Sequence, residues 1–155
     1  MSSFDAAMDR DANRQVITSN ESFKLESTWT FVTATTGATG AHTLFTVTGN
    51  VLVSVFGVCD TSLDGAATLE VGVASNTAQL LAQIANATTL DDGDVYVDAD
   101  TEVGAGLIPS MQVLNDGTDI IMTIGATAVT AGAVDFYCLW RPLSSNGNVT
   151  VTTPA

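Results

Sequence analysis

The residues best suited to chemistry are the acidic side chains of residues 90–102, LDDGDVYVDADTE, where six of thirteen residues are Asp or Glu. Carboxylates at this density could hold Ca²⁺, which prefers oxygen ligands. Neither group of aspartates has the EF-hand spacing with its turn Gly and terminal Glu. We therefore predict no metal site and interpret the cluster as a solvated acidic surface. The only ligand candidates to test are Asp91, Asp92, Asp94, Asp98 and Asp100.

The same stretch fits a half-exposed strand over 94–100, because successive side chains of a strand point to opposite faces. This register places Val95, Val97 and Ala99 on one face. We expect Tyr96 to lie on the other face together with the acidic residues, and that face to be exposed.

Residues that could form a catalytic site are few. The sole histidine, His42, lies in GAHTL without a recognisable nucleophile pattern around it. Asp60-Thr61-Ser62 is similar to the Asp-Thr-Ser/Gly of aspartic proteases, in which two carboxylates share a proton, and a dimer could supply the second aspartate. The same residues followed by Asp64-Gly65 are also typical of a turn that ends a strand. We predict that the protein is not an enzyme, with no catalytic residues and no cofactor.

Charge excludes several classes of partner. The chain has 17 acidic residues against four Lys or Arg, for a formal net charge of -13. Nucleic-acid affinity depends on Lys and Arg that displace counterions from phosphates, so we expect no nucleic-acid partner and no anionic membrane partner.

No stretch approaches the roughly 18 apolar residues of a membrane helix, and the first residues lack the apolar core of a signal peptide.

Period-two alternation of β-branched and aromatic residues predicts strands along most of the chain. The segment 42–60 reads as two strands joined by a tight hairpin at Gly49-Asn50, with the second strand central because both of its faces are apolar. Residues 77–87, TAQLLAQIANA, fit a helix and a strand about equally well. The other predicted strands are 29–35, 67–73, 94–100, 118–126, 133–141 and 148–152.

About eight short strands with Gly, Asn and Asp turns predict an all-β fold, an antiparallel β-sandwich of the jelly-roll-like kind. Trp29 and Trp140 are expected in its core, and Pro142 is expected to end a strand because it cannot donate a ladder hydrogen bond. The two cysteines, Cys59 and Cys138, are interpreted as buried thiols rather than a disulfide.

The chain divides into an extended N-terminal arm, residues 1–27, and a β-sandwich domain, residues 28–155. The arm is less regular and contains three of the four cations. From composition alone it is either an ordinary chain terminus or a docking arm. If it docks, the candidate contact residues are Phe4, Met8, Arg10 and Arg14.

Three segments carry a family resemblance: residues 8–23 (MDRDANRQVITSNESF), residues 44–83 (beginning LFTVTGNVLVSVFGVCD) and residues 136–152 (FYCLWRPLSSNGNVTVT). They resemble small proteins encoded among the virion genes of tailed bacteriophages. The resemblance covers most of the chain, and LWRPLSS is its most distinctive part. It implies a structural protein of the phage head and no catalytic residues.

The resemblance implies a capsid decoration, or cement, protein. Such a protein binds the outer surface of the capsid of the virion, commonly as a homotrimer, and stabilises the shell by bridging major capsid protein subunits. It is assembled in the host cytoplasm, and its N-terminal arm supplies much of the contact. The alternative is a phage tail, fibre or host-attachment protein that binds a glycan through exposed aromatic residues such as Tyr96 or Tyr137. A lectin-like module that uses calcium is a further rival.

Overall fold

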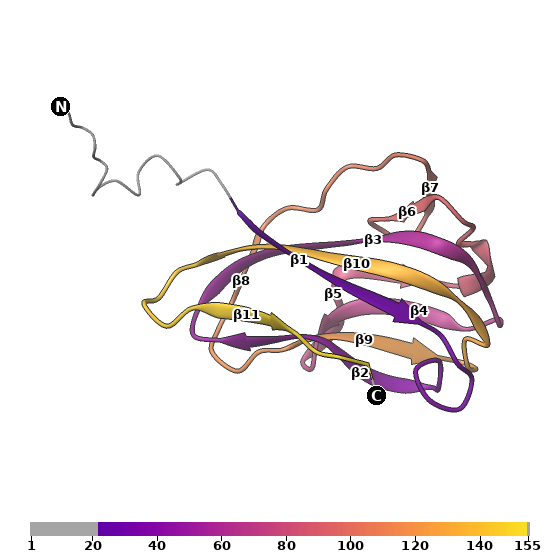
Figure 1. The fold of residues 1–155 in the computed structure, drawn as a ribbon, viewed down its shortest axis with the longest axis horizontal. Helices are drawn as coiled ribbons and strands as arrows, with labels where there is room; N and C mark the ends of the chain where they lie inside the picture. Colours follow the sequence, from indigo (N-terminus) through magenta and orange to yellow (C-terminus); the bar gives the residue numbers. More distant parts are fainter. Residues whose placement is uncertain (1–21, 155) are drawn as a thin grey trace.

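Alternating apolar and polar residues form eleven strands within residues 22–154, the part of the chain described by a computed structural model. The strands make two sheets that pack face to face (Figure 1), and every strand pair is antiparallel. The predicted all-β antiparallel sandwich is therefore confirmed, with more strands than the eight expected.

The first sheet has β3 at its centre. Its side chains alternate, so that Val51, Val53 and Val55 are buried in the sandwich. β3 pairs with β10 on one side and with both β6 and β8 on the other, which confirms the prediction that this strand is central. The six strands are β1 (Phe23–Thr30), β10 (Ala131–Pro142), β3 (Val51–Asp64), β6 (Asp94–Tyr96), β7 (Thr101–Val103) and β8 (Gln112–Leu114).

The second sheet closes the other side of the core. The segment 77–87, which fitted helix and strand equally, forms most of β5 and then the short 3₁₀ helix η1 (Ala87–Thr89). The segment is a strand because it pairs with β4. In this conformation Leu80, Leu81 and Ile84 are buried. In order, the five strands are β11 (Asn148–Val151), β2 (Gly40–Thr48), β9 (Ile120–Gly125), β4 (Thr68–Val73) and β5 (Asn76–Ile84).

The tight connection at Gly49-Asn50 is confirmed, but it is not a hairpin. β2 belongs to the second sheet and β3 to the first, so the chain crosses the sandwich there. Gly49 has a φ of 65°, and a Cβ on it would lie 2.7 Å from the side chains of Ser144 and Asn146. The Gly49 amide donates to Asp116 Oδ1 at 2.6 Å. These contacts hold a turn that connects the two sheets. The residues Gly49 and Asn50 suit a tight turn of either kind, so they do not distinguish this turn from a hairpin.

The first strand begins earlier than its alternation suggested. β1 ends at Thr30, and residues 33–39 form turns instead of continuing the predicted strand 29–35. The loop folds back because Thr36 Oγ1 donates to the Thr30 carbonyl at 2.6 Å and accepts from the Val32 amide at 2.9 Å. Residues 23–27, assigned to the arm from sequence, pair with β10 from Trp140 to Phe136.

The core lies between the sheets and contains the expected tryptophans. Trp29 and Trp140 are 3% and 8% exposed, and β10 ends at Pro142 as predicted. Cys59 and Cys138 are buried free thiols. Burial raises the pKa of the Cys59 thiol to about 11 and that of Cys138 to about 12, so both stay protonated near neutral pH.

Candidate functional site

The outward face of the six-stranded sheet carries a row of apolar side chains where solvent-facing polar residues are usual. Inward and outward residues alternate along β3, so Leu52, Phe56 and Val58 point away from the core and are half-buried. The pairing of β3 with β10 sets Phe56 opposite Tyr137, and their rings stack with centroids 5.2 Å apart. The row therefore extends across at least two strands.

The loop from Gly104 to Met111 extends this row. A Cβ on Gly106 would lie 3.1 Å from the side chains of Val95 and Val97, so the loop lies close against β6. Ser54 Oγ donates to the Pro109 carbonyl at 2.7 Å, which holds the loop to β3. Between these two contacts Leu107 is 89% exposed, so an anchored loop holds an apolar side chain in solvent.

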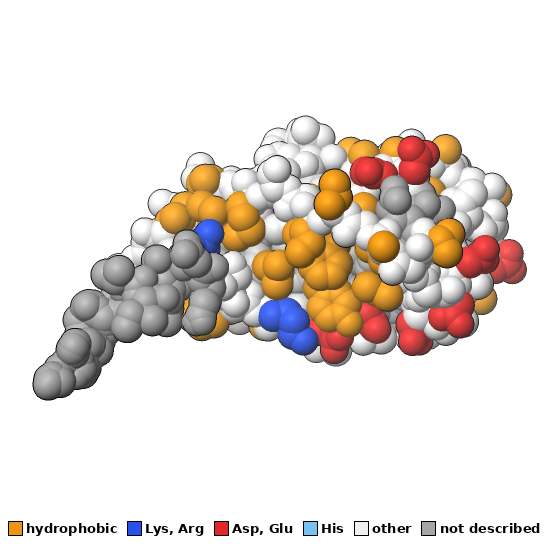
Figure 2. Space-filling view, turned by 90° about the horizontal axis from the view of Figure 1, so that it is seen from above, with side chains coloured by type: hydrophobic (Ala, Val, Ile, Leu, Met, Phe, Trp, Pro, Cys, Tyr) orange, Lys and Arg blue, Asp and Glu red, His pale blue; other side chains and the backbone are white. Residues whose placement is uncertain are grey.

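We call this surface the apolar face. Figure 2 looks onto it and shows hydrophobic side chains gathered near its middle, with acidic side chains concentrated toward one end. An apolar patch on a strongly acidic molecule marks an interaction surface, because it would otherwise favour aggregation. The apolar face consists of Leu52, Phe56, Val58, Val95, Leu107, Ile108, Val113 and Leu139.

The apolar face also carries both cations of the described residues. Lys24 and Arg141 are the only Lys or Arg in residues 22–154, which contain thirteen acidic residues. Lys24 lies opposite Leu139, and Arg141 lies opposite Leu52, on the outward side of the sheet. Lys24 Nζ is 5.6 Å from the centroid of the Tyr137 ring, within cation–π range.

The cations are balanced by acids on the same face. Glu26 lies opposite Tyr137 and accepts a hydrogen bond from its hydroxyl, which stabilises the protonated phenol. This bond, with smaller contributions from burial and from the charges of Glu26 and Asp135, raises the pKa of Tyr137 to about 12. Asp135 accepts from Thr28 Oγ1 at 2.6 Å. The apolar face is therefore close to neutral, whereas most acidic residues lie elsewhere.

The structure corrects the predicted orientation of the acidic stretch. β6 covers only residues 94–96, and both Asp94 and Tyr96 point into the protein rather than to solvent. The Tyr96 hydroxyl lies 3.0 Å from the Leu69 carbonyl and 2.9 Å from the Ala82 carbonyl, and burial raises its pKa. Tyr96 is thus a core residue and cannot contact a glycan, while Tyr137 remains on the surface.

Most of the acidic cluster makes local turns. Asp94 Oδ2 accepts from the Asp91 amide at 3.0 Å, and Asp98 Oδ1 accepts from the Asp100 amide at 2.9 Å. The Asp92 amide donates to Ser62 Oγ at 2.9 Å. Among the side chains that the structure describes, no three His, Cys, Asp or Glu are grouped so as to hold a metal ion. The carboxylates of Asp94 and Asp98 therefore have a structural role as turn acceptors.

The protease-like triplet lies within a strand rather than in a turn. Asp60, Thr61 and Ser62 are exposed residues of β3, which continues to Asp64. Pairing with β10 extends the strand as far as Asp64, opposite Ala131, and the expected turn follows at Gly65, whose φ is 98°. The arm candidates Phe4, Met8, Arg10 and Arg14 lie outside the described residues.

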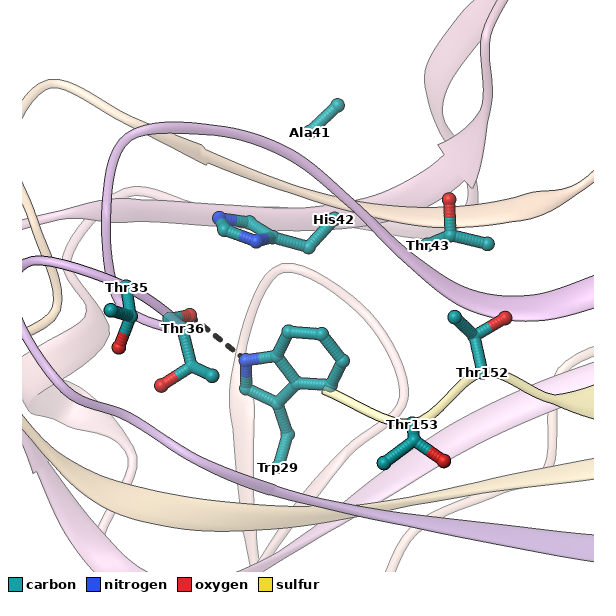
Figure 3. Close-up of a pocket in the computed structure, with 8 residues that line it drawn as sticks. All are labelled: Trp29, Thr35, Thr36, Ala41, His42, Thr43, Thr152 and Thr153. Atoms are coloured by element: carbon teal, nitrogen blue, oxygen red, sulfur yellow. Dashed lines mark hydrogen bonds between the residues drawn. The ribbon is translucent and has the colours of Figure 1, made fainter. Parts of the chain in front are cut away.

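A second feature is a pocket of about 480 Å³ at the open side of the sandwich, where the first strand of one sheet approaches β2 and the chain end beyond β11 (Figure 3). His42 lies across the Trp29 indole with ring centroids 5.7 Å apart and an interplanar angle of 67°. Thr152 and Thr153 form the other side. Sequence reasoning missed this pocket, because its residues come from segments more than 100 positions apart.

Comparison of the chain with protein-family models, curated proteins and solved structures finds no match. In the described part of the chain, no helix has the length and apolar character needed to cross a membrane.

Proposed function

We propose that this chain is a capsid decoration protein of a tailed bacteriophage, which binds the outside of the capsid and bridges major capsid protein subunits without catalysis. The observation that carries this proposal is the apolar face. Binding sites for protein partners combine exposed apolar side chains with a few polar groups at their margin. The resemblance of the sequence segments to phage virion proteins favours the coat shell as the partner.

Electrostatics favours the apolar face as the docking surface. A protein with a net charge of -13 repels other acidic surfaces over most of its own. The apolar face carries Lys24 and Arg141 together with Glu26 and Asp135, so a partner meets little net charge there. The coat surface that fits it is apolar at the centre, with both signs of charge at its rim.

The first experiment adds purified protein to capsids that lack it. Leu107→Glu and Val113→Glu place a carboxylate on the apolar face at side chains that are 89% and 58% exposed, so the fold should tolerate them. We expect each to weaken capsid binding by about tenfold or more, because a buried unpaired charge costs several kcal/mol at most interfaces (about 2–5). Val32→Glu is the matched control, since Val32 is 53% exposed and belongs to the loop after β1, where its carbonyl accepts from the Gly37 amide at 2.8 Å.

The outcomes separate the candidates. Loss of binding in the two variants but not in the control supports docking through the apolar face. If all three bind like the natural protein, this face does not contact the coat. If the two variants instead lose a homotrimer, measured by light scattering, the face joins copies of this chain and the coat contact lies elsewhere.

Copy number distinguishes the decoration protein from the tail or fibre alternative. Quantitative mass spectrometry of purified virions should find copies comparable in number to the major capsid protein. A handful of copies would favour the tail, fibre or host-attachment protein, for which Tyr137 is the remaining aromatic candidate. Absence from the particle would overturn both.

A further inference from the structure

Strand pairing gives the apolar face a midpoint. Leu25 of β1, Cys138 of β10 and Val55 of β3 lie opposite one another and define one level across the sheet, which we call the middle level. Their own side chains pack in the core. The outward neighbours on β10, Leu139 and Tyr137, lie one residue to either side of the middle level. Positions on the face can therefore be counted from it in both directions.

The apolar residues are placed symmetrically about the middle level. On β3, Leu52 and Val58 lie three residues to either side of it, and both point outward. Val113 of β8 lies opposite Leu52, and Val95 of β6 lies opposite Val58. Each of these residues at one end of the face thus has an apolar counterpart at the same distance on the other end.

The charged residues share this midpoint but change sign across it. On β10, Arg141 lies three residues to one side of the middle level and Asp135 three residues to the other. On β1, Lys24 lies one residue to the first side and Glu26 one residue to the second. In Figure 2 the blue side chains accordingly lie toward one end of the face and the red ones toward the other. The face is therefore positive at one end and negative at the other.

A surface with this pattern is complementary to itself. A two-fold axis that lies between two facing copies and crosses their strands at the middle level exchanges the ends of the face. It brings Arg141 to Asp135 of the second copy and Lys24 to Glu26, while apolar residues meet apolar residues. An axis parallel to the strands would instead place the cations of both copies at the same end. Charge therefore selects one arrangement of the two copies.

We propose that two copies of this chain pair through the apolar face about the axis that crosses the strands. Packed sheets lie about 10 Å apart, a gap that side chains from both sides fill. The arrangement uses each of the two charge pairs twice, so that ion pairs flank the apolar centre. Over the acidic remainder of their surfaces, two molecules of net charge -13 repel one another, which favours approach through this face.

The size of the face sets the strength of the dimer. The six residue steps from Leu52 to Val58 span about 20 Å, and four neighbouring strands span about 14 Å. This footprint of about 300 Å² is smaller than the roughly 800 Å² that each partner buries in a stable complex. We therefore expect a weak, reversible dimer with a Kd of about 10–100 μM.

The dimer has one consequence for the proposed function. If the coat also binds the apolar face, the dimer and the capsid-bound form exclude one another, and dilution or binding to the capsid separates the two copies. This consequence rests on the proposed function, whereas the dimer itself does not.

The test is sedimentation equilibrium of the full chain without capsids, from about 5 to 500 μM at physiological salt, a range that brackets the expected Kd. Lys24→Glu and Glu26→Lys each set like charges together at two symmetry-related contacts, so each should raise the Kd about tenfold or more. Both side chains are exposed, so the fold should tolerate the changes. The exchange variant Lys24→Glu/Glu26→Lys should restore the Kd to within about threefold, because each charge again meets its opposite.

The variants supply their own control for net charge. Glu26→Lys removes one negative charge and adds one positive charge, which changes the net charge from -13 to -11. General repulsion would therefore strengthen self-association in this variant, whereas the proposed contact weakens it. The exchange variant keeps the composition and the net charge of the natural chain.

Three outcomes overturn the proposal: a monomer at every concentration, stronger self-association of Glu26→Lys, or an exchange variant as weak as the single variants. Because the measurement contains no capsids, its failure leaves the capsid-binding proposal unaffected. Failure of the capsid experiment likewise leaves the dimer in place.

Discussion

The hydroxyl of Tyr96 in the six-stranded sheet reaches the backbone carbonyl of Leu69 in the five-stranded sheet, at 3.0 Å, across the core. It also lies 2.9 Å from the carbonyl of Ala82. Both carbonyls lie where the β4–β5 ladder shifts register between Leu69 and Val71. A register shift leaves backbone groups without a ladder partner, and Tyr96 supplies the donor that the irregularity requires.

Tyr96→Phe should therefore destabilise the fold by about 1–3 kcal/mol, because it removes the buried O–H donor beside the Leu69 and Ala82 carbonyls while it preserves the ring. The measurement is urea unfolding at neutral pH. Tyr137→Phe removes the other tyrosine hydroxyl, which lies on the surface, and should change stability by less than about 0.5 kcal/mol. Equal effects in the two variants would contradict a special role for Tyr96.

The fold class could be predicted because period-two alternation survives in most strands. The orientation of 94–100 could not, because a strand of three residues ends before its alternation is established. Tyr96 and Asp94 are polar enough to suggest exposure, yet both have hydrogen-bond partners inside the protein: the Asp91 amide of its own turn for Asp94, and the Leu69 carbonyl of the other sheet for Tyr96. Side-chain polarity thus predicts the face of a short strand poorly when a buried partner is available.

The functional surfaces were less accessible to sequence reasoning. Leu52, Phe56 and Val58 were visible as a second apolar face of β3, and they were read only as evidence for a central strand. The same pattern on a sheet whose outer side lacks a covering layer is the signal for an interaction surface. For the pocket no local signal exists, because Trp29 and Thr153 meet only through the packing of the two sheets.

The hydrogen bond between Glu26 and Tyr137 gives a prediction for ultraviolet titration of the phenol. Glu26→Gln removes the carboxylate that is the largest cause of the raised pKa of Tyr137, so this pKa should fall from about 12 toward its ordinary value. Tyr96→Phe serves as the background, because Tyr137 is then the only tyrosine. An unchanged titration midpoint would show that Glu26 does not hold the phenolic proton.

Alkaline pH should weaken the fold through its buried thiols. Unfolded thiols ionise near pH 9, whereas burial raises the pKa of Cys59 to about 11 and of Cys138 to about 12. Between these values the unfolded state binds fewer protons, so stability is complete below about pH 9 and falls as pH rises. Urea midpoints across this range should fall less steeply in Cys138→Ala. An identical slope would assign the loss to other groups.

Two truncations test where the proposed arm ends and what it does. Removing residues 1–21 leaves β1 intact, so the melting temperature should stay within a few degrees of the full chain, while capsid binding weakens if the removed segment docks.

Removing residues 1–27 also deletes Leu25 and Ser27, which pair with Cys138 and Phe136. That loss exposes the edge of β10 and should lower the melting temperature markedly, because Trp140 also loses its ring contact with Phe23 at 4.9 Å. Calorimetry and capsid co-sedimentation of both proteins give the two readouts. Unfolding of the shorter deletion would make residues 1–21 part of the folded core, and unchanged capsid binding would leave the apolar face as the contact with the coat.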